Sequence, residues 1–330
     1  MGNNSDFKKS IYSAIIGLAA GDAVGVPAEF IQPHIIAKHP VTEMCGGGTH
    51  GMPLGTWSDD TSLTIAAAAG LAESGCKPDY NKIMDNFTAW LGKAEFTATG
   101  EIFDVGGCCM QAIHNYYRKK TDPVLCGPKS EQDCGNGAIM RIIPALFWCR
   151  RFYGEGFIRN AEALEVIHNL TALTHGHSRC LMANGIYLSI ADKLLSGKDK
   201  ETSIREGIDE ALEVYRSMHG FTGEFKHFER LAAAGFAETP REEIRSKGYV
   251  IDTIEAAVWC FLNTESYREC ILKAVNLGHD TDTIAAVAGA LAGIYYGLGD
   301  PTGIPAEWVN NLLELSLICD ICDRFAEKLA

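Results

Sequence analysis

The stretch NLGHDTDTIAAVAGALAGIYYG, residues 276–297, joins a polar acidic cluster to a long apolar run. Four consecutive residues alternate acid and hydroxyl at the start of that run: Asp280, Thr281, Asp282 and Thr283. The run is rich in alanine and glycine, and its periodicity predicts a helix over 281–297. Because small side chains let a neighbouring helix approach closely, we expect this helix to be buried and central.

A second segment with the same pattern lies far upstream in the chain. WSDDTSLTIAAAAGLAE begins at Trp57 and places Ser58, Asp59 and Asp60 at the start of an alanine-rich helix expected over 59–74. If the two helices pair in the core, both acidic N-termini come to the same place. The similarity is too short to prove an internal duplication.

Two interpretations fit these clusters, and the residues alone leave both open. One Asp, Ser or Thr at an N-cap satisfies an orphan backbone N–H, and acids in the first turn favour the helix dipole. Capping accounts for one or two residues per helix, whereas each cluster holds more. Several carboxylates on buried helices repel one another unless cations neutralise them, and Mg²⁺, Mn²⁺ or Ca²⁺ prefer such oxygen ligands.

Three further segments also have a structural and a functional interpretation. In IIGLAAGDAVGVPAEF, glycines end a helix before Pro27, or the small residues let Glu29 reach a buried site. The segment THGHS places His175 and His177 at the start of another helix, where a histidine is either structural or part of a site. No third nitrogen ligand accompanies them, as a zinc site would need.

The third segment is GNGAIMRIIPALF, which begins at Gly135 and precedes a helix expected over 138–151. Most Gly-Asn-Gly runs are turns. Free backbone N–H groups at a helix start also suit an anion, especially a pyrophosphate. On its own this segment is a weak phosphate signal.

Helical periodicity dominates nearly the whole chain, and alternating strand patterns are hardly found. The expected helices cover residues 6–20, 59–74, 80–92, 104–119, 138–151, 157–173, 177–196, 203–218, 250–263, 266–276, 281–297 and 306–328. The longer irregular stretches are 40–56, 121–137 and 219–249. Because no low-complexity linker or composition shift divides the chain, we expect one compact all-α domain over residues 1–330.

Composition and charge exclude several classes of protein. With 330 residues, 47% hydrophobic and 22% charged, the chain reads as a soluble globular protein. A net charge of −13 argues against nucleic-acid binding, because no basic excess is available to release counterions. We expect no signal peptide and no membrane span, since glycines and Asp22 interrupt the first apolar run. The twelve scattered cysteines, including the C-x-x-C of Cys319 and Cys322, are expected to be reduced thiols in the cytoplasm.

Taken together and in this order, the segments closely resemble the ADP-ribosylglycohydrolase family, which includes the dinitrogen-reductase-activating glycohydrolases. The matching elements are GLAAGDAVGVPAEF, GTWSDDTSLTIAAA, FDVGGCCMQAI, GNGAIMRIIP, THGHSRCLMANGIY and AVNLGHDTDTIAAVAGALAGIYYG. They extend from about residue 11 to residue 297, and the pairing of SDDT with DTDT is highly specific.

The resemblance implies an all-α, orthogonal multi-helix fold with a binuclear metal centre, two Mg²⁺ or Mn²⁺ ions, at the base of an ADP-ribose cleft. The implied metal ligands are Ser58, Asp59, Asp60, Asp280, Asp282 and Thr283. The implied catalytic carboxylates are Asp59, Asp60, Glu29 and Asp104, with Asp104 near the scissile bond. The implied substrate-binding residues are Asp104 near the scissile bond, His175 on the ribose side, and, around the diphosphate, Gly135, Asn136, Gly137 and Met140. Ser58 stands where the family often has Thr, and Cys108 and Cys109 stand where many relatives carry Thr.

The expected function is hydrolysis of the N-glycosidic bond of ADP-ribosyl-arginine, which removes ADP-ribose from a modified protein. Three alternatives stay open: serine-linked ADP-ribose, a small-molecule conjugate such as O-acetyl-ADP-ribose or a ureido or guanidino compound, and non-catalytic binding of ADP-ribose. The intact acidic set weighs against a pure binder. Asp104 favours a guanidinium leaving group, because a carboxylate pairs with it bidentately.

Overall fold

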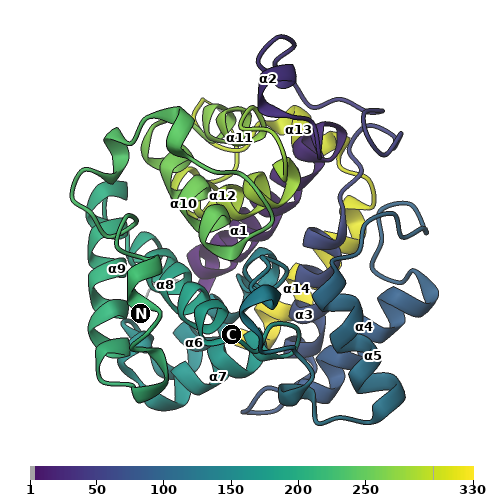
Figure 1. Cartoon of the computed structure of the whole chain (residues 1–330). Coiled ribbons are helices and arrows are strands. Elements are labelled where there is room, and N and C mark those ends of the chain that lie inside the picture. Colours follow the sequence, from purple (N-terminus) through teal and green to yellow (C-terminus); the bar gives the residue numbers. More distant parts are fainter. Residues whose placement is uncertain (1–3, 300) are drawn as a thin grey trace.

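Helices and the loops between them make up the part of the chain that the computed structural model describes, residues 4–299 and 301–330 (Figure 1). The α-helices are α1 (Asn4–Gly25), α2 (Pro33–Ile36), α3 (Asp59–Ala72), α4 (Tyr80–Lys93), α5 (Gly107–Lys119), α6 (Pro144–Tyr153), α7 (Ala161–Ala172), α8 (Ser178–Leu195), α9 (Lys200–Arg216), α10 (Val250–Leu262), α11 (Tyr267–Val275), α12 (Thr281–Tyr296), α13 (Ala306–Asn311) and α14 (Leu315–Leu329). Among the described residues there is no strand, only isolated β-bridges. The all-α prediction is confirmed.

Helix α1 packs against α12 along its length, and glycines bring the two backbones into contact. A Cβ atom added at Gly21 would lie 2.2 Å from the carbonyl oxygen of Ala285, and one at Gly25 would lie 2.3 Å from the Cα of Asp282. Only glycine fits such an approach. The prediction of a buried, central helix over 281–297 is confirmed, since α12 is buried from Thr281 through Gly293.

The first helix was expected to end at about residue 20, and this prediction is wrong. Helix α1 continues to Gly25, so the glycines that resemble helix terminators lie inside it. Each interior glycine disfavours a helix by about 1 kcal/mol. Close packing against α12 overrides that preference, and the extension places Asp22 within the helix.

The same helix has the length and composition of a membrane span, although glycines and Asp22 interrupt its apolar run. Residues Ser5–Ala28 contain a window of mean hydropathy 1.5, of which 94% is buried inside the protein. Its apolar character is explained by burial in the core, where its neighbours are α12, α3 and α14.

Three expected helices are each interrupted by a break. In 138–151, a 3₁₀ turn at Ile139–Arg141 comes first, and α6 begins at Pro144, a residue suited to the first helical position. In 157–173, Asn160 caps α7 by accepting from the N–H groups of the two residues that follow Ala161.

The third interruption separates α13 from α14 within 306–328. Glu314 has a positive φ of 49°, which directs the chain into a new helix at Leu315. The other eight expected helices agree with the observed bounds to within three residues. The stretches 40–56, 121–137 and 219–249 contain no α-helix, as expected.

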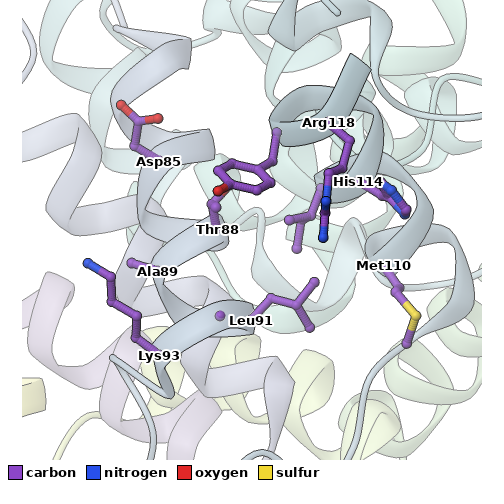
Figure 2. A pocket seen from close by; sticks show the side chains of 11 residues that line it. Asp85, Thr88, Ala89, Leu91, Lys93, Met110, His114 and Arg118 are labelled. Carbon is purple, nitrogen blue, oxygen red and sulfur yellow. The ribbon is translucent and has the colours of Figure 1, made fainter. Parts of the chain in front are cut away.

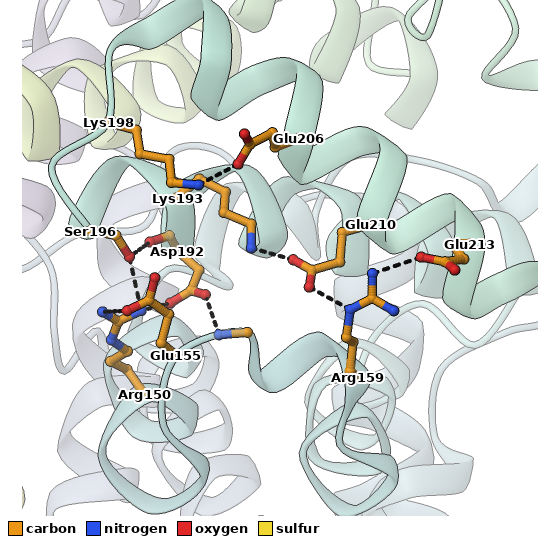
Figure 3. Close-up of polar contacts among 11 residues, drawn as sticks. Arg150, Glu155, Arg159, Asp192, Lys193, Ser196, Lys198, Glu206, Glu210 and Glu213 are labelled. Carbon is orange, nitrogen blue, oxygen red and sulfur yellow. Dashed lines mark hydrogen bonds and ion pairs between the residues drawn. The ribbon is translucent and has the colours of Figure 1, made fainter.

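Ion pairs tie α6, α8 and α9 together on the outer side of the fold (Figure 3). The carboxylate of Asp192 on α8 accepts from Arg150 at 2.5 Å and from the N–H of Gly156 at 2.8 Å. Glu210 on α9 accepts from Arg159 at 2.6 Å and pairs with Lys193. Because breaking a buried pair leaves an uncompensated charge, these contacts fix α8 in one position.

We predict that Gly21→Ala destabilises the fold, because its methyl group would force α1 and α12 apart. The expected loss in the free energy of unfolding is about 1–3 kcal/mol. Gly92→Ala on α4 is the matched control, since a Cβ there meets nothing within 4 Å and should stabilise by about 0.4–1 kcal/mol. Urea denaturation followed by circular dichroism compares the two variants. Equal stabilisation by both would contradict the close packing of α1 and α12.

Candidate metal centre and substrate cleft

The N-termini of α3 and α12 meet in the core, as the paired motifs predicted. The hydroxyl of Thr283 on α12 donates to Oδ2 of Asp60 on α3 at 3.3 Å. Asp60 is fully buried, and Asp282 is 1% exposed. Both acidic clusters therefore contribute to one buried site.

Helix capping is carried out by residues other than the clustered aspartates. Ser58 is the N-cap of α3, and its hydroxyl accepts from the N–H of Asp60 at 3.3 Å. Asp22 on α1 accepts from the N–H groups of Ser58 at 3.0 Å and Thr61 at 3.1 Å. The carboxylates of Asp59 and Asp60 are therefore not needed as caps.

The same holds at the start of α12. Asp280 occupies the N-cap position, yet its side chain makes no capping hydrogen bond. Its Oδ2 instead accepts from the side-chain amide of Asn136 at 2.9 Å. Capping therefore explains Ser58. Among the acids, Oδ1 of Asp282 accepts from the N–H of Thr283 at 2.9 Å, but its Oδ2 has no partner among the described residues.

The carboxylates form two groups that share Asp282. Oxygens of Asp22, Asp60 and Asp282 lie within 4.8 Å of one another, and so do oxygens of Glu29, Asp104 and Asp282. Within the described residues, Oδ1 of Asp60 and Oδ2 of Asp282 are buried without a hydrogen-bond partner. Unpaired buried carboxylate oxygens are costly, and a divalent cation is the kind of ligand that would satisfy them.

Burial is the main cause of strongly raised pKa values at this site. It raises the pKa of Asp22 to about 6 and, with the charges of Asp104, Asp280 and Asp59, that of Glu29 to about 9. Burial likewise raises the pKa values of Asp59, Asp60 and Asp282 well above the ordinary range.

The donor set fits hard divalent cations. All five ligand candidates in the two groups, and Asp59 beside them, offer carboxylate oxygen, which Mg²⁺, Mn²⁺ and Ca²⁺ prefer over nitrogen or sulfur. A bound cation would neutralise the mutual repulsion of these acids and satisfy the two unpaired oxygens. The ligand set inferred from the sequence stays a prediction.

A cavity of about 310 Å³ opens next to the buried carboxylates Asp22, Asp60 and Asp282, which are called the carboxylate floor below. Most of the site residues inferred from the sequence line it: Glu29, Asp59, Asp104, Gly135, Asn136, Gly137, Met140, His175, Asp280 and Thr283. Ser58, Asp60 and Asp282 are not among its lining residues. The structure thus separates a buried carboxylate floor from the carboxylates that a ligand in the cavity can touch.

The Gly-Asn-Gly segment differs from the expected anion cradle. The N–H of Asn136 donates to the carbonyl of Gly248 at 3.2 Å, so it is not free. The side-chain amide of Asn136 donates to Asp280 and, at 2.9 Å, to Thr253. The segment leads into a 3₁₀ turn rather than an α-helix. Asn136 therefore positions Asp280 and the Gly248 loop.

His175 lies behind this segment and is 2% exposed. Burial lowers the pKa of its imidazole to about 3, so the ring is neutral at ordinary pH. A Cβ at Gly137 would lie 2.9 Å from Cε1 of His175 and 2.7 Å from Sγ of Cys109, which requires glycine there. His177 is not part of the cavity, because its ring caps α8.

Sequence reasoning missed three residues of the site. Asp22 was noted only within a glycine-rich segment, although a single charge inside an apolar helix is a usable signal of function. His50, from an irregular loop, hydrogen-bonds the carboxylate of Glu29, and its ring centroid lies 5.1 Å from that of Phe103. Phe30 lines the cavity, is 59% exposed and has a strained φ of 63°.

Comparisons with known proteins agree with this geometry. The model of the ADP-ribosylglycohydrolase family matches residues 3–330. The chain is 31% identical over 299 residues to the ADP-ribosylarginine hydrolase Tri1 of Pseudomonas putida, covering 91% of this chain and 73% of the relative. It is 29% identical over 301 residues to the ADP-ribosyl-dinitrogen reductase glycohydrolase of Rhodospirillum rubrum, covering 91% of this chain and 88% of that relative. A solved structure of an ADP-ribosylglycohydrolase-related protein complex has 28% identity and a TM-score of 0.78, covering 99% of this chain and 100% of that one.

We predict that, in chelator, the free energy of unfolding falls as pH rises from about 5 to about 9. The folded pKa values of Asp22 and Glu29 lie above their ordinary values of 3.8 and 4.5, so folding favours the protonated forms. That stability is fully present below the ordinary values and is lost as pH passes about 6 and then about 9. Each unit of raised pKa corresponds to about 1.4 kcal/mol.

Urea unfolding across this pH range, with chelator and with saturating Mg²⁺, measures the effect. Mg²⁺ should restore stability most at the alkaline end, where the acids are ionised. Asp282→Asn removes the charge that both groups share, so it should reduce both the pH dependence and the gain from Mg²⁺. A stability that rises with pH in chelator would contradict the raised pKa values.

Proposed function

The chain belongs to the ADP-ribosylglycohydrolase family, and from this we propose that it removes ADP-ribose from modified arginine side chains of proteins. The observation that carries the proposal is the pair of carboxylate groups sharing Asp282 beneath a cavity of about 310 Å³. A binding protein has no need of so many buried acids, because they destabilise the fold when no cation is present.

We propose that two divalent cations, Mg²⁺ or Mn²⁺, bind between these groups. Asp22 and Asp60 would hold one cation, Glu29 and Asp104 would face the other, and Asp282 would belong to both. When bound, the cations supply Lewis-acid polarisation of ribose hydroxyls and a water with a lowered pKa. Asp22, Glu29 and Asp104 are additions to the ligand set inferred from the sequence.

Whether a carboxylate lines the cavity decides the role that we propose for it. Glu29, Asp59 and Asp104 line the cavity, so they can contact the ribose and the attacking water. Asp60 lies outside the lining, so it would hold a cation without contacting the substrate. In the hydrolysis, a water oxygen bonds to the anomeric carbon while the carbon–nitrogen bond breaks. A cavity carboxylate accepts the water's proton and passes it to the departing nitrogen, so the leaving group departs as a guanidinium.

Two cavity residues favour arginine as the leaving group. The carboxylate of Asp104 can accept a charge-assisted hydrogen bond from a guanidinium. The ring of Phe30 offers an exposed face at the same cavity, and a planar guanidinium stacks on aromatic rings. A serine hydroxyl would use neither contact. A main-chain hydrogen bond of 2.6 Å from Phe30 to the carbonyl of His279 holds this residue in its strained conformation.

We also propose a cytoplasmic location. All twelve cysteines are free in the structure, and eight of them are buried among other side chains. Free thiols in this number are typical of a reducing compartment.

Incubation with arginine- and serine-linked ADP-ribosyl peptides, with and without chelator, tests the proposed function. We expect release of ADP-ribose from the arginine peptide only, and its loss in chelator. Asp59→Asn and Asp282→Asn should each abolish hydrolysis and weaken Mn²⁺ binding, which calorimetry measures independently. Full activity in either variant, or in chelator, would exclude a cation-dependent reaction at these carboxylates.

For Phe30, we predict that replacement by alanine raises KM for the arginine peptide by about threefold to tenfold, with little change in kcat. Phe30→Trp keeps a stacking surface and should retain the wild-type KM. Inhibition by free ADP-ribose should be the same in all three proteins, because it lacks the arginine. If Phe30→Ala weakens inhibition by ADP-ribose as much as it raises KM for the arginine peptide, the ring does not recognise the leaving group.

A further inference from the structure

A groove of about 580 Å³ lies between α4 and α5 on the surface, outside the cavity described above (Figure 2). Figure 2 shows Asp85, Thr88, Leu91 and Lys93 on one side, and Met110, His114 and Arg118 on the other. Ile113 is buried beneath it. No step of the proposed hydrolysis uses these residues.

Large apolar side chains of α5 stay exposed along this groove. Met110 is 48% exposed and Tyr117 is 53% exposed, and both line it. Exposed apolar side chains grouped in a groove, rather than scattered singly, mark sites of interaction. Methionine and tyrosine are well suited to contact varied polypeptide surfaces.

The charge of this surface is opposite to that of the whole chain. The chain carries 42 acidic and 29 basic residues, yet α5 contains no acid along its 13 residues. Arg118 lies 5.8 Å and Lys120 5.3 Å from the ring centroid of Tyr117. Among the lining residues the one acid is Asp85, which accepts from the hydroxyl of Tyr116 at 2.8 Å.

Across the groove, Lys93 adds a further cation on α4. It lies 3.6 Å from Glu95, but its side chain is 73% exposed and this surface pair is weak. The groove is therefore a basic, partly apolar strip on an acidic protein. Its chemical complement is a segment that carries both carboxylates and apolar side chains.

Helix α5 connects the groove directly to the substrate cavity. Gly107 and Cys108, at its start, line the cavity, whereas Met110 and Tyr117 line the groove. From Gly107 to Tyr117 the helix rises about 15 Å. An extended peptide covers that length in about four to six residues.

We propose that the α4–α5 groove docks an acidic and apolar stretch of the ADP-ribosylated protein, about four to six residues from the modified arginine. The proposal rests on the proposed function, because it takes the modified side chain to enter the neighbouring cavity. The groove then supplies affinity for protein substrates, and the cavity supplies the chemistry. A small ADP-ribosyl conjugate would not reach the groove.

Three substrates test the docking site: free ADP-ribosylarginine, an ADP-ribosylarginine peptide with Glu and Leu four to six residues away on both sides, and the same peptide with Lys and Ser there. We expect KM for the acidic–apolar peptide to be about tenfold lower than for the other two. The double variant Arg118→Glu, Lys120→Glu should raise KM for the acidic–apolar peptide about fivefold to tenfold. It should leave KM for free ADP-ribosylarginine unchanged. Tyr117→Ser should raise KM for the acidic–apolar peptide about threefold.

The matched control is Arg205→Glu with Arg216→Glu on α9, which lies on the other side of the molecule (Figure 1). This pair makes the same change in net charge, and Arg216 also occupies the last turn of its helix. Its KM values should match the wild type. Equal KM for all three substrates, or the same loss in the α9 variant, would overturn the docking site.

Binding of the unmodified acidic–apolar peptide, followed by fluorescence anisotropy, separates this proposal from the proposed function. Binding that the α5 variant weakens, with no hydrolysis of any substrate, would retain the docking site and reject the proposed function. Hydrolysis of free ADP-ribosylarginine, with no binding of the peptide, would retain the proposed function and reject the docking site. A dimer that the α5 variant disrupts, with peptide KM unchanged, would assign the groove to a second copy of the chain and overturn the proposal.

Discussion

The contact between the backbones of α1 and α12 is the constraint on which the rest of the structure depends. Glycines at positions 17, 21 and 25 face Ala285, Gly289 and the first turn of α12, with no side chain between the two main chains. This approach puts the two main chains in direct contact. It also places one acid of each helix, Asp22 and Asp282, in the same small volume.

That proximity has an electrostatic cost which cations can offset. Asp22 is held by hydrogen bonds from the start of α3, so it ties α1 to α3 and cannot move away from Asp282. Asp60 and Asp282 each retain a buried oxygen without a partner among the described residues. A fold that concentrates acids in this way gives up stability in the absence of metal, and in return it provides rigid ligands for cations.

The sequence predicts the helices well where the periodicity is strong, and it predicts the site where a motif is specific. Both acidic motifs were placed together correctly because alanine-rich helices must be buried, and the family resemblance is confirmed by the match over residues 3–330. Asp22 was missed because glycines inside α1 resemble helix terminators; their spacing of four residues indicates a close helix contact instead. The role of Asn136 was missed because it depends on Gly248, a distant loop residue whose position no local pattern encodes. His50 was missed because it reaches Glu29 from an irregular loop, whose position no local pattern encodes either.

Anomalous X-ray diffraction from crystals grown with Mn²⁺ is the most direct test of the shared-carboxylate site. We expect two anomalous peaks in the core, one beside Asp22 and Asp60 and one beside Glu29 and Asp104, with Asp282 in contact with both. A single peak, peaks remote from Asp282, or no peak at saturating Mn²⁺ would contradict a two-cation centre built on the contact between α1 and α12.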